Sequence, residues 1–164
     1  MKSFALYQTV TIKLIKDNPV FSLVLLSIII KTIQLFGIPV LTTSDTHGYF
    51  SSAVSYWEFN KNDFALRMPL YPLFIYFIAE LSDKLFLIVF IQQILSVVSM
   101  VFVFKLFKLF TNDVYSLWGS VLFLLNPISI YNSYILTESI GLSLSIIFFF
   151  YYIKELYQPD YRNI

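Results

Sequence analysis

Long apolar runs, separated by short polar stretches, make up most of this chain. About 20 apolar residues cross the hydrocarbon core of a bilayer, so four runs are predicted to be membrane-spanning helices. They lie at 19–41, 85–110, 114–130 and 135–156. A fifth run, 69–81, is apolar almost all round, but as a helix it reaches only roughly 20 Å, short of the roughly 30 Å core. It is predicted to be an embedded helix that does not cross.

The longest polar stretch, 42–68, contains apolar residues at helical spacing. They predict an amphipathic helix in the membrane surface, with Ser51, Ser52, Ser55 and Glu58 off its apolar stripe. The stripe consists of Tyr49, Phe50, Ala53, Val54 and Trp57. Turn residues at 60–63 would end this helix. With the embedded helix it gives a loop, 42–84, that carries two membrane-lying helices.

The N-terminal residues, 1–16, mix apolar side chains with lysines. They predict a short interfacial helix on the cytoplasmic surface, and the alternative is a frayed tail. No small-residue cleavage site follows the first apolar run, so we expect that run to be retained rather than removed as a signal peptide. Lys31, the one charge within it, is predicted to snorkel to the membrane interface.

Composition and charge support this interpretation. The chain has 164 residues, of which 58% are hydrophobic and only 13% charged, too apolar for a soluble domain. The net charge of +1 gives no basic field for nucleic acid, and cysteine is absent, which excludes disulfides and zinc–thiolate sites. The single histidine cannot form a multi-histidine metal site. We therefore predict an all-α integral membrane protein formed by one module, 1–164.

Lysines and arginines orient the predicted spans. If 69–81 does not cross, seven of them lie on the cytoplasmic side, and the positive-inside rule favours that arrangement. They are Lys2, Lys13, Lys16, Lys105, Lys108, Lys154 and Arg162. Both termini are then cytoplasmic, and the loop 42–84 and the start of the fourth span share the outer face. The expected location is the plasma (inner) membrane of a prokaryote.

The candidate functional residues are predicted to lie on that outer face. Asp45 is either a helix N-cap or a carboxylate that accepts a proton from an incoming hydroxyl or amine. Glu138 is either a first-turn helix charge or a functional carboxylate at membrane depth. Arg67 is either a contact to lipid phosphate or a clamp on a phosphate of a lipid-linked substrate. His47 follows Asp45 closely and is otherwise a surface residue.

Gln92, Gln93 and Asn126 are predicted to form hydrogen bonds between helices rather than to bind a ligand. No phosphate-binding glycine loop, nucleophile elbow or metal-ligand pattern occurs in the sequence.

Three motifs in this order resemble the start of a GT-C superfamily membrane glycosyltransferase. They are Ser44-Asp45-Thr46-His47-Gly48-Tyr49-Phe50, then Arg67-Met68-Pro69-Leu70-Tyr71-Pro72-Leu73, and then Asn126-Pro127 with Leu136-Thr137-Glu138-Ser139. The nearest branch contains the dolichyl-phosphate-mannose protein mannosyltransferases, the lipid A aminoarabinose transferase and the rhizobial lipopolysaccharide glycosyltransferases.

The resemblance implies a sugar donor linked to polyprenyl phosphate and an inverting transfer on the non-cytoplasmic face to a lipid, glycan or protein. It makes Asp45 the catalytic residue, places Arg67 on the donor phosphate, and adds Glu138, His47 and Tyr71 as substrate-binding residues. It assigns no metal ligand, and a divalent metal requirement stays open. The chain matches only the front part of the family's architecture, so we expect no transferase activity from it in isolation.

Two other classes stay open. One is a non-catalytic multi-pass membrane subunit or remnant that binds a partner subunit. The other is a small transporter, which ranks last because the sequence contains no internal repeat and its polar residues gather toward one surface.

Overall fold

The computed structural model describes residues 17–57, 69–82, 84–127 and 132–157. The predicted interfacial helix at 1–16, the turn at 60–63 and the candidate Arg67 lie outside these residues.

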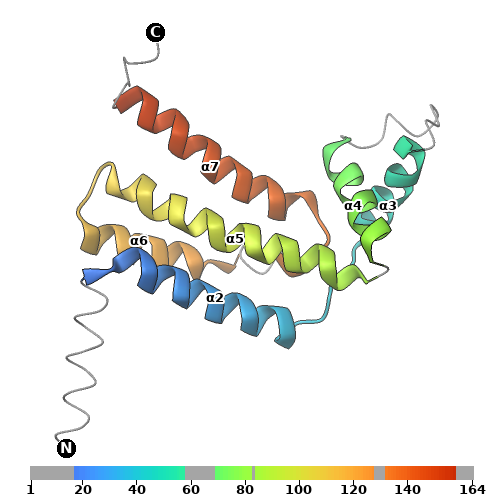
Figure 1. Cartoon of the computed structure of the whole chain (residues 1–164), viewed down its shortest axis with the longest axis horizontal. Helices are drawn as coiled ribbons and strands as arrows, with labels where there is room; N and C mark the ends of the chain where they lie inside the picture. The colour runs from blue at the N-terminus through green and yellow to red at the C-terminus, as the bar shows by residue number, and fades with distance from the viewer. Residues whose placement is uncertain (1–16, 58–68, 83, 128–131, 158–164) are drawn as a thin grey trace, which may run out of the picture. The chain divides into compact units, whose positions relative to one another are not determined.

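The described part of the chain is all-helical and contains no strand, only one isolated bridge between Leu41 and Tyr134 (Figure 1). Its helices are α2 (Pro19–Gly37), α3 (Ser44–Trp57), α4 (Leu70–Leu81), α5 (Leu85–Lys108), α6 (Asp113–Leu124) and α7 (Thr137–Tyr157). Three of them, α2, α5 and α7, are long and apolar enough to cross a membrane. The predicted helices at 69–81, 85–110 and 135–156 are confirmed within two residues at each end.

Two helices end earlier than their apolar runs, and a proline explains each case. In α2 the last helical hydrogen bond joins the Ile38 N–H to the Gln34 carbonyl, and Pro39 follows. The residue before a proline is forced out of helical geometry, and proline itself has no N–H to donate. In α6 the helix stops at Leu124, shortly before Pro127.

The early end of α6 changes the predicted span at 114–130. With 12 residues, α6 is about 18 Å long, too short to cross the hydrocarbon core as a helix. The described residues therefore contain three helices of spanning length where the sequence predicted four.

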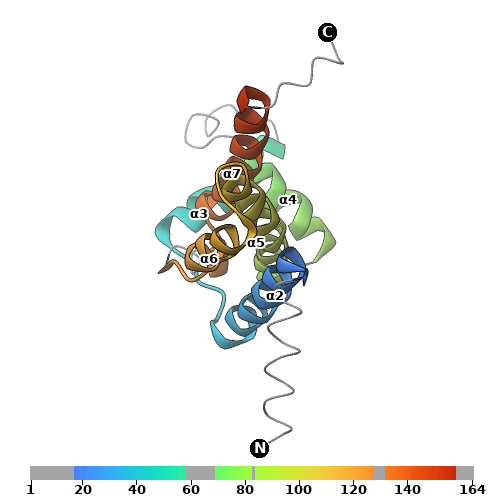
Figure 2. The same ribbon diagram turned by 90° about the vertical axis from the view of Figure 1, so that its left-hand side faces the viewer.

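The chain divides into two compact units. Unit 1 comprises Met1–Thr32, Val97–Pro127 and Leu142–Ile164, and unit 2 comprises Ile33–Ser96 and Ile128–Gly141. Each of the long helices α2, α5 and α7 contributes residues to both units. In unit 1, α6 lies beside α2 and α5 in both views (Figures 1 and 2). The hydrophobic core cluster of this unit contains the buried residues Leu23, Met100, Val103, Phe104 and Leu124.

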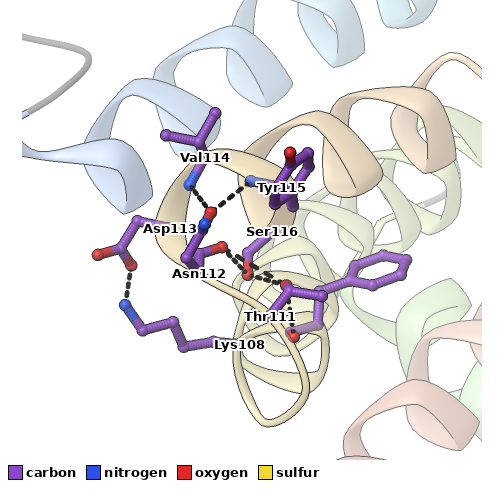
Figure 3. Close-up of polar contacts among 8 residues, drawn as sticks. Lys108, Thr111, Asn112, Asp113, Val114, Tyr115 and Ser116 are labelled. Carbon is purple, nitrogen blue, oxygen red and sulfur yellow. Dashed lines mark hydrogen bonds and ion pairs between the residues drawn. The ribbon is translucent and has the colours of Figure 1, made fainter.

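The turn from α5 to α6 in unit 1 is held by local polar contacts (Figure 3). Asn112 is the N-cap of α6, and its side-chain oxygen accepts hydrogen bonds from the N–H groups of Val114 and Tyr115, both at 3.1 Å. Lys108 and Asp113 form an exposed ion pair across the turn. These contacts satisfy N–H groups that a helix start leaves without an intrahelical partner.

Lys31 does not snorkel. Its side chain is only 3% exposed, and it continues the buried stripe Leu23, Ser27, Lys31 along one face of α2. Residues four apart share a helix face, so Lys31 points to the protein interior like its two neighbours on that stripe. The prediction of an interfacial lysine is therefore wrong for this structure.

The core of unit 2 joins α3, α4, the first half of α5 and the segment before α7. It contains Tyr49, Tyr71, Ile75, Ile78, Ile88, Val89, Ile135 and Leu136. Within this unit α3 packs against α4 (Figure 1).

The predicted apolar stripe of α3 is only partly correct. Tyr49 and Ala53 are buried as expected, but Ser52 and Ser55 are buried too, whereas Val54 is half exposed. The buried face of α3 is thus rotated toward its small hydroxyl side chains, which allow close packing between helices.

Candidate functional site

The candidate site in unit 2 is assembled on the extended segment that precedes α7. The Leu41 N–H donates to the Ser133 carbonyl at 3.0 Å, and the Ile135 N–H donates to the Leu41 carbonyl at 3.2 Å. This parallel bridge joins the residues that follow α2 to those that lead into α7. The loop that carries α3 and the start of α7 are therefore fixed to each other by backbone hydrogen bonds.

The first turn of α3 is attached to the same segment. The Thr43 N–H donates to Thr46 Oγ1 at 2.9 Å, the Thr46 N–H approaches Thr43 Oγ1 at 3.4 Å, and the two residues thus form a reciprocal capping box. Thr46 Oγ1 also donates to the Ile135 carbonyl at 3.1 Å. Thr46 is fully buried, so this contact anchors the start of α3 from inside the unit.

Asp45 is not the N-cap of α3, because Thr43 holds that position. Asp45 lies in the first helical turn and is exposed, where the helix dipole favours a carboxylate. His47 is also exposed on α3. Residues two apart on a helix point to different sides, so the proximity of Asp45 and His47 in sequence does not make them a facing pair.

Two tyrosines connect α3 to α4 and α7. The ring of Tyr49 meets the ring of Tyr71 edge-on, with centroids 5.0 Å apart and an interplanar angle of 85°. The Tyr49 hydroxyl and Thr137 Oγ1 form a hydrogen bond of 2.9 Å. Tyr71 is 5% exposed, and no described residue accepts a hydrogen bond from its hydroxyl.

Burial raises the pKa of the Tyr71 hydroxyl far above its ordinary value, and the nearby Tyr49 and Glu138 raise it further. Tyr71 therefore keeps its proton and is a hydrogen-bond donor throughout the physiological pH range. The structure links Tyr71 to Glu138 through two intervening residues. The Tyr49 ring packs on Tyr71, the Tyr49 hydroxyl is hydrogen-bonded to Thr137 Oγ1, and Thr137 directly precedes Glu138.

Glu138 lies in the first turn of α7 and is exposed. The Thr137 hydroxyl approaches its Oε2 atom at 3.3 Å. Unit 2 thus brings together two of the predicted site residues, Tyr71 and Glu138. Asp45 lies on α3, which Thr46 and Tyr49 attach to Ile135 and Thr137 at the start of α7.

Gln92 forms the predicted hydrogen bonds between elements. Its Nε2 atom donates to the Tyr134 carbonyl at 3.2 Å and approaches the Leu136 carbonyl at 3.4 Å. Gln93 is 3% exposed, and neither of its amide atoms has a hydrogen-bond partner among the described residues. Asn126 is exposed at the end of α6.

The structure contains a buried polar network that the sequence did not predict. Asn132 Nδ2 donates to Ser96 Oγ at 3.0 Å, and Ser139 Oγ donates to Asn132 Oδ1 at 2.6 Å. The only sequence signal is a polar pair, Asn132-Ser133, between two apolar runs. The network ties the segment before α7 to α5.

No group of three or more histidine, aspartate or glutamate side chains lies close enough to hold a metal ion among the described residues.

Comparison with protein-family models finds no matching family, and searches of curated proteins and of solved structures find no match either.

Proposed function

We propose that the chain is an integral membrane protein with four crossings and cytoplasmic termini, and that it acts in sugar transfer from a polyprenyl-phosphate donor. The first support is the surface of the long helices. Large apolar side chains are more than half exposed along α2 and α7, among them Phe21, Ile33, Phe36, Phe148 and Leu156. Such surfaces are unfavourable in water and favourable in lipid.

Unit 2 itself gives a reason for a fourth crossing. The residues after α2, the first half of α5 and the start of α7 meet there, through Leu41 and Gln92. The other end of α5, which is about 36 Å long at 24 residues, leads into α6. If α5 spans the bilayer, α6 and the residues after it return the chain to the face where α7 starts. That arrangement agrees with the lysine and arginine distribution.

Single cysteines test this topology cleanly, because the chain has none of its own. We expect cysteines at Lys84 and Lys108 to react with a membrane-impermeant maleimide from opposite sides of the membrane. A cysteine at Lys154 should behave like the one at Lys108. If the Lys154 position is labelled from the Lys84 side, α6 and the following segment do not cross and the chain spans three times.

The transfer function rests on one observation: α3, with Asp45 in its first turn, and the start of α7, with Glu138, are fixed to one corner of unit 2 by long-range hydrogen bonds. We assign Asp45 as the base that activates the acceptor and Arg67 as the contact to the donor phosphate. We also assign Glu138 and Tyr71 to substrate binding, and His47 lies on the same helix as Asp45. This assignment follows the GT-C resemblance of the three motifs.

The direct test measures transfer of radiolabelled sugar from a polyprenyl-phosphate donor in native membranes, with the chain present, deleted or restored. Restoration by the wild-type chain and not by an Arg67→Ala variant would support the proposal. If deletion leaves transfer unchanged, the chain is not needed for it. If deletion abolishes transfer while both Arg67→Ala and Asp45→Asn restore it fully, the chain acts instead as a non-catalytic subunit.

A further inference from the structure

The Tyr71 hydroxyl and the Glu138 carboxylate form an incomplete pair in unit 2. The hydroxyl is buried and has no hydrogen-bond partner among the described residues. The carboxylate belongs to the residue after Thr137, whose hydroxyl is hydrogen-bonded to Tyr49, and the Tyr49 ring packs edge-on against the Tyr71 ring. A buried polar group without a hydrogen bond is costly, so its persistence calls for an explanation. We propose that Tyr71 and Glu138 together bind a hydroxyl group of the sugar carried by the lipid-linked substrate. This inference rests on the proposed function and specifies which part of the substrate the pair contacts.

The chemistry of the pair selects the ligand group. Tyr71 retains its proton and donates, whereas ionised Glu138 only accepts. A group between them must accept from one and donate to the other. A hydroxyl does both, a phosphate oxygen would be repelled by Glu138, and an ammonium cannot accept from Tyr71. Sugars present many hydroxyls, so the pair suits a carbohydrate rather than the lipid phosphate.

Neighbouring contacts hold both members in place. Tyr49 supports the ring of Tyr71 edge-on and is hydrogen-bonded to Thr137. Thr137 in turn approaches only the Oε2 atom of Glu138, so this contact does not occupy Oε1. Glu138 is the exposed member of the pair.

The test compares lipids that differ only in the sugar. The full chain is placed in lipid nanodiscs, and the Kd is measured for geranylgeranyl phosphate and for the same lipid carrying mannose, glucose or galactose. We expect at least one sugar lipid to bind about tenfold more tightly than the bare phosphate, the scale of one hydrogen bond to a charged group. Tyr71→Phe and Glu138→Gln should each remove that difference and leave binding of the bare phosphate unchanged.

Two variants on α4 are matched controls: Tyr76→Phe removes a hydroxyl and Glu80→Gln removes a charge, and both should keep the preference for sugar. Tyr71→Phe preserves the ring, so near-wild-type thermal unfolding should show that it is folded. If all four lipids bind the wild type equally, or the preference survives both site variants, the sugar subsite is wrong while donor binding stands. If no lipid binds, the proposed function fails as well.

Discussion

Units 1 and 2 use polar side chains differently. In unit 1 two buried serines bond within their own helices: Ser27 donates to the Leu23 carbonyl at 2.8 Å, and Ser120 donates to the Ser116 carbonyl at 2.7 Å. In unit 2 the buried contacts join distant parts of the chain, such as Thr46 to Ile135, 89 positions apart. A contact within one turn forms with the helix itself, whereas a contact across 89 positions exists only in the folded unit.

The two units also differ in whether their buried side-chain polar atoms form hydrogen bonds. Every buried side-chain polar atom that lacks a hydrogen bond in the described residues belongs to unit 2, on Tyr71, Gln92, Gln93 or Ser133. Buried unsatisfied groups lower stability, and proteins tolerate them where function needs them. The unsatisfied groups of the described residues therefore lie in the unit that contains the proposed transfer site.

The largest expected effect concerns two aspartates in equivalent positions. Asp45 lies in the first turn of α3 in unit 2, and Asp113 lies in the first turn of α6 in unit 1. If Asp45 activates the acceptor, Asp45→Asn should lower sugar transfer in native membranes by roughly two to four orders of magnitude, the scale of a general base. Binding of the lipid-linked donor should be unchanged.

Asp113→Asn is the matched control, because it removes the same charge from the same type of helix position. It should leave transfer at the wild-type rate. Equal rates for Asp45→Asn and wild type, at equal expression, would mean that Asp45 only stabilises the helix start. Thr43 rather than Asp45 caps α3, so loss of capping cannot explain a large effect.

The next prediction concerns the same substitution, glutamine to leucine, at two adjacent positions. Gln92 Nε2 donates to backbone carbonyls of unit 2, whereas both amide atoms of Gln93 lack a described partner. We expect Gln92→Leu to lower the free energy of unfolding by about 1–2 kcal/mol, because it leaves buried carbonyls without a donor. Gln93→Leu should raise it by about 1 kcal/mol, because it removes an unsatisfied buried amide.

Unfolding of the purified chain in detergent measures both changes, and Ser120→Ala in unit 1 provides the reference for loss of a local hydrogen bond. Destabilisation by Gln93→Leu equal to that of Gln92→Leu would mean that Gln93 has a partner in the folded protein. The contrast between satisfied and unsatisfied groups would then not hold at this position.

Much of the fold could be predicted from the length of the apolar runs. Helices α4, α5 and α7 follow directly from runs of sufficient length bounded by polar residues. The ends of α2 and α6 did not follow, because Pro39 and the Asn126-Pro127 pair lie inside runs that are otherwise apolar. Hydropathy does not measure whether a residue has a backbone N–H. Proline lacks this donor, and that lack ends each helix.

Less of the candidate site could be predicted. The contact between Tyr49 and Thr137 joins residues 88 positions apart, and no local pattern encodes it. The burial of Lys31, Ser52 and Ser55 depends on which helix face meets a neighbour, and hydrophobicity alone assigned those residues to the membrane interface or to the polar face. The resemblance did select Tyr71 and Glu138, which Tyr49 and Thr137 connect in the structure.

A smaller effect is expected at the cap of α6 in unit 1. Asn112→Ala removes the acceptor of two N–H groups and should cost about 1 kcal/mol of unfolding free energy, the usual value for an N-cap. Asn112→Ser, which keeps a capping oxygen, should cost much less. Sugar transfer should be normal in both variants. A loss of transfer with Asn112→Ala would contradict the proposal that the transfer site lies in unit 2.

The smallest expected effect concerns the ion pair of the same turn (Figure 3). The side chains of Lys108 and Asp113 are 45% and 55% exposed, so solvent screens their attraction. A double-mutant cycle with Lys108→Met and Asp113→Asn should give a coupling energy of about 0.2–1 kcal/mol, the range of exposed pairs. In 1 M salt, where the screening length falls to about 3 Å, the coupling should nearly vanish. A coupling that is larger and insensitive to salt would show that the pair is shielded from water in the membrane-bound protein. Unit 1 would then contain a polar contact that depends on the folded state, and the contrast with unit 2 would be weaker at this turn.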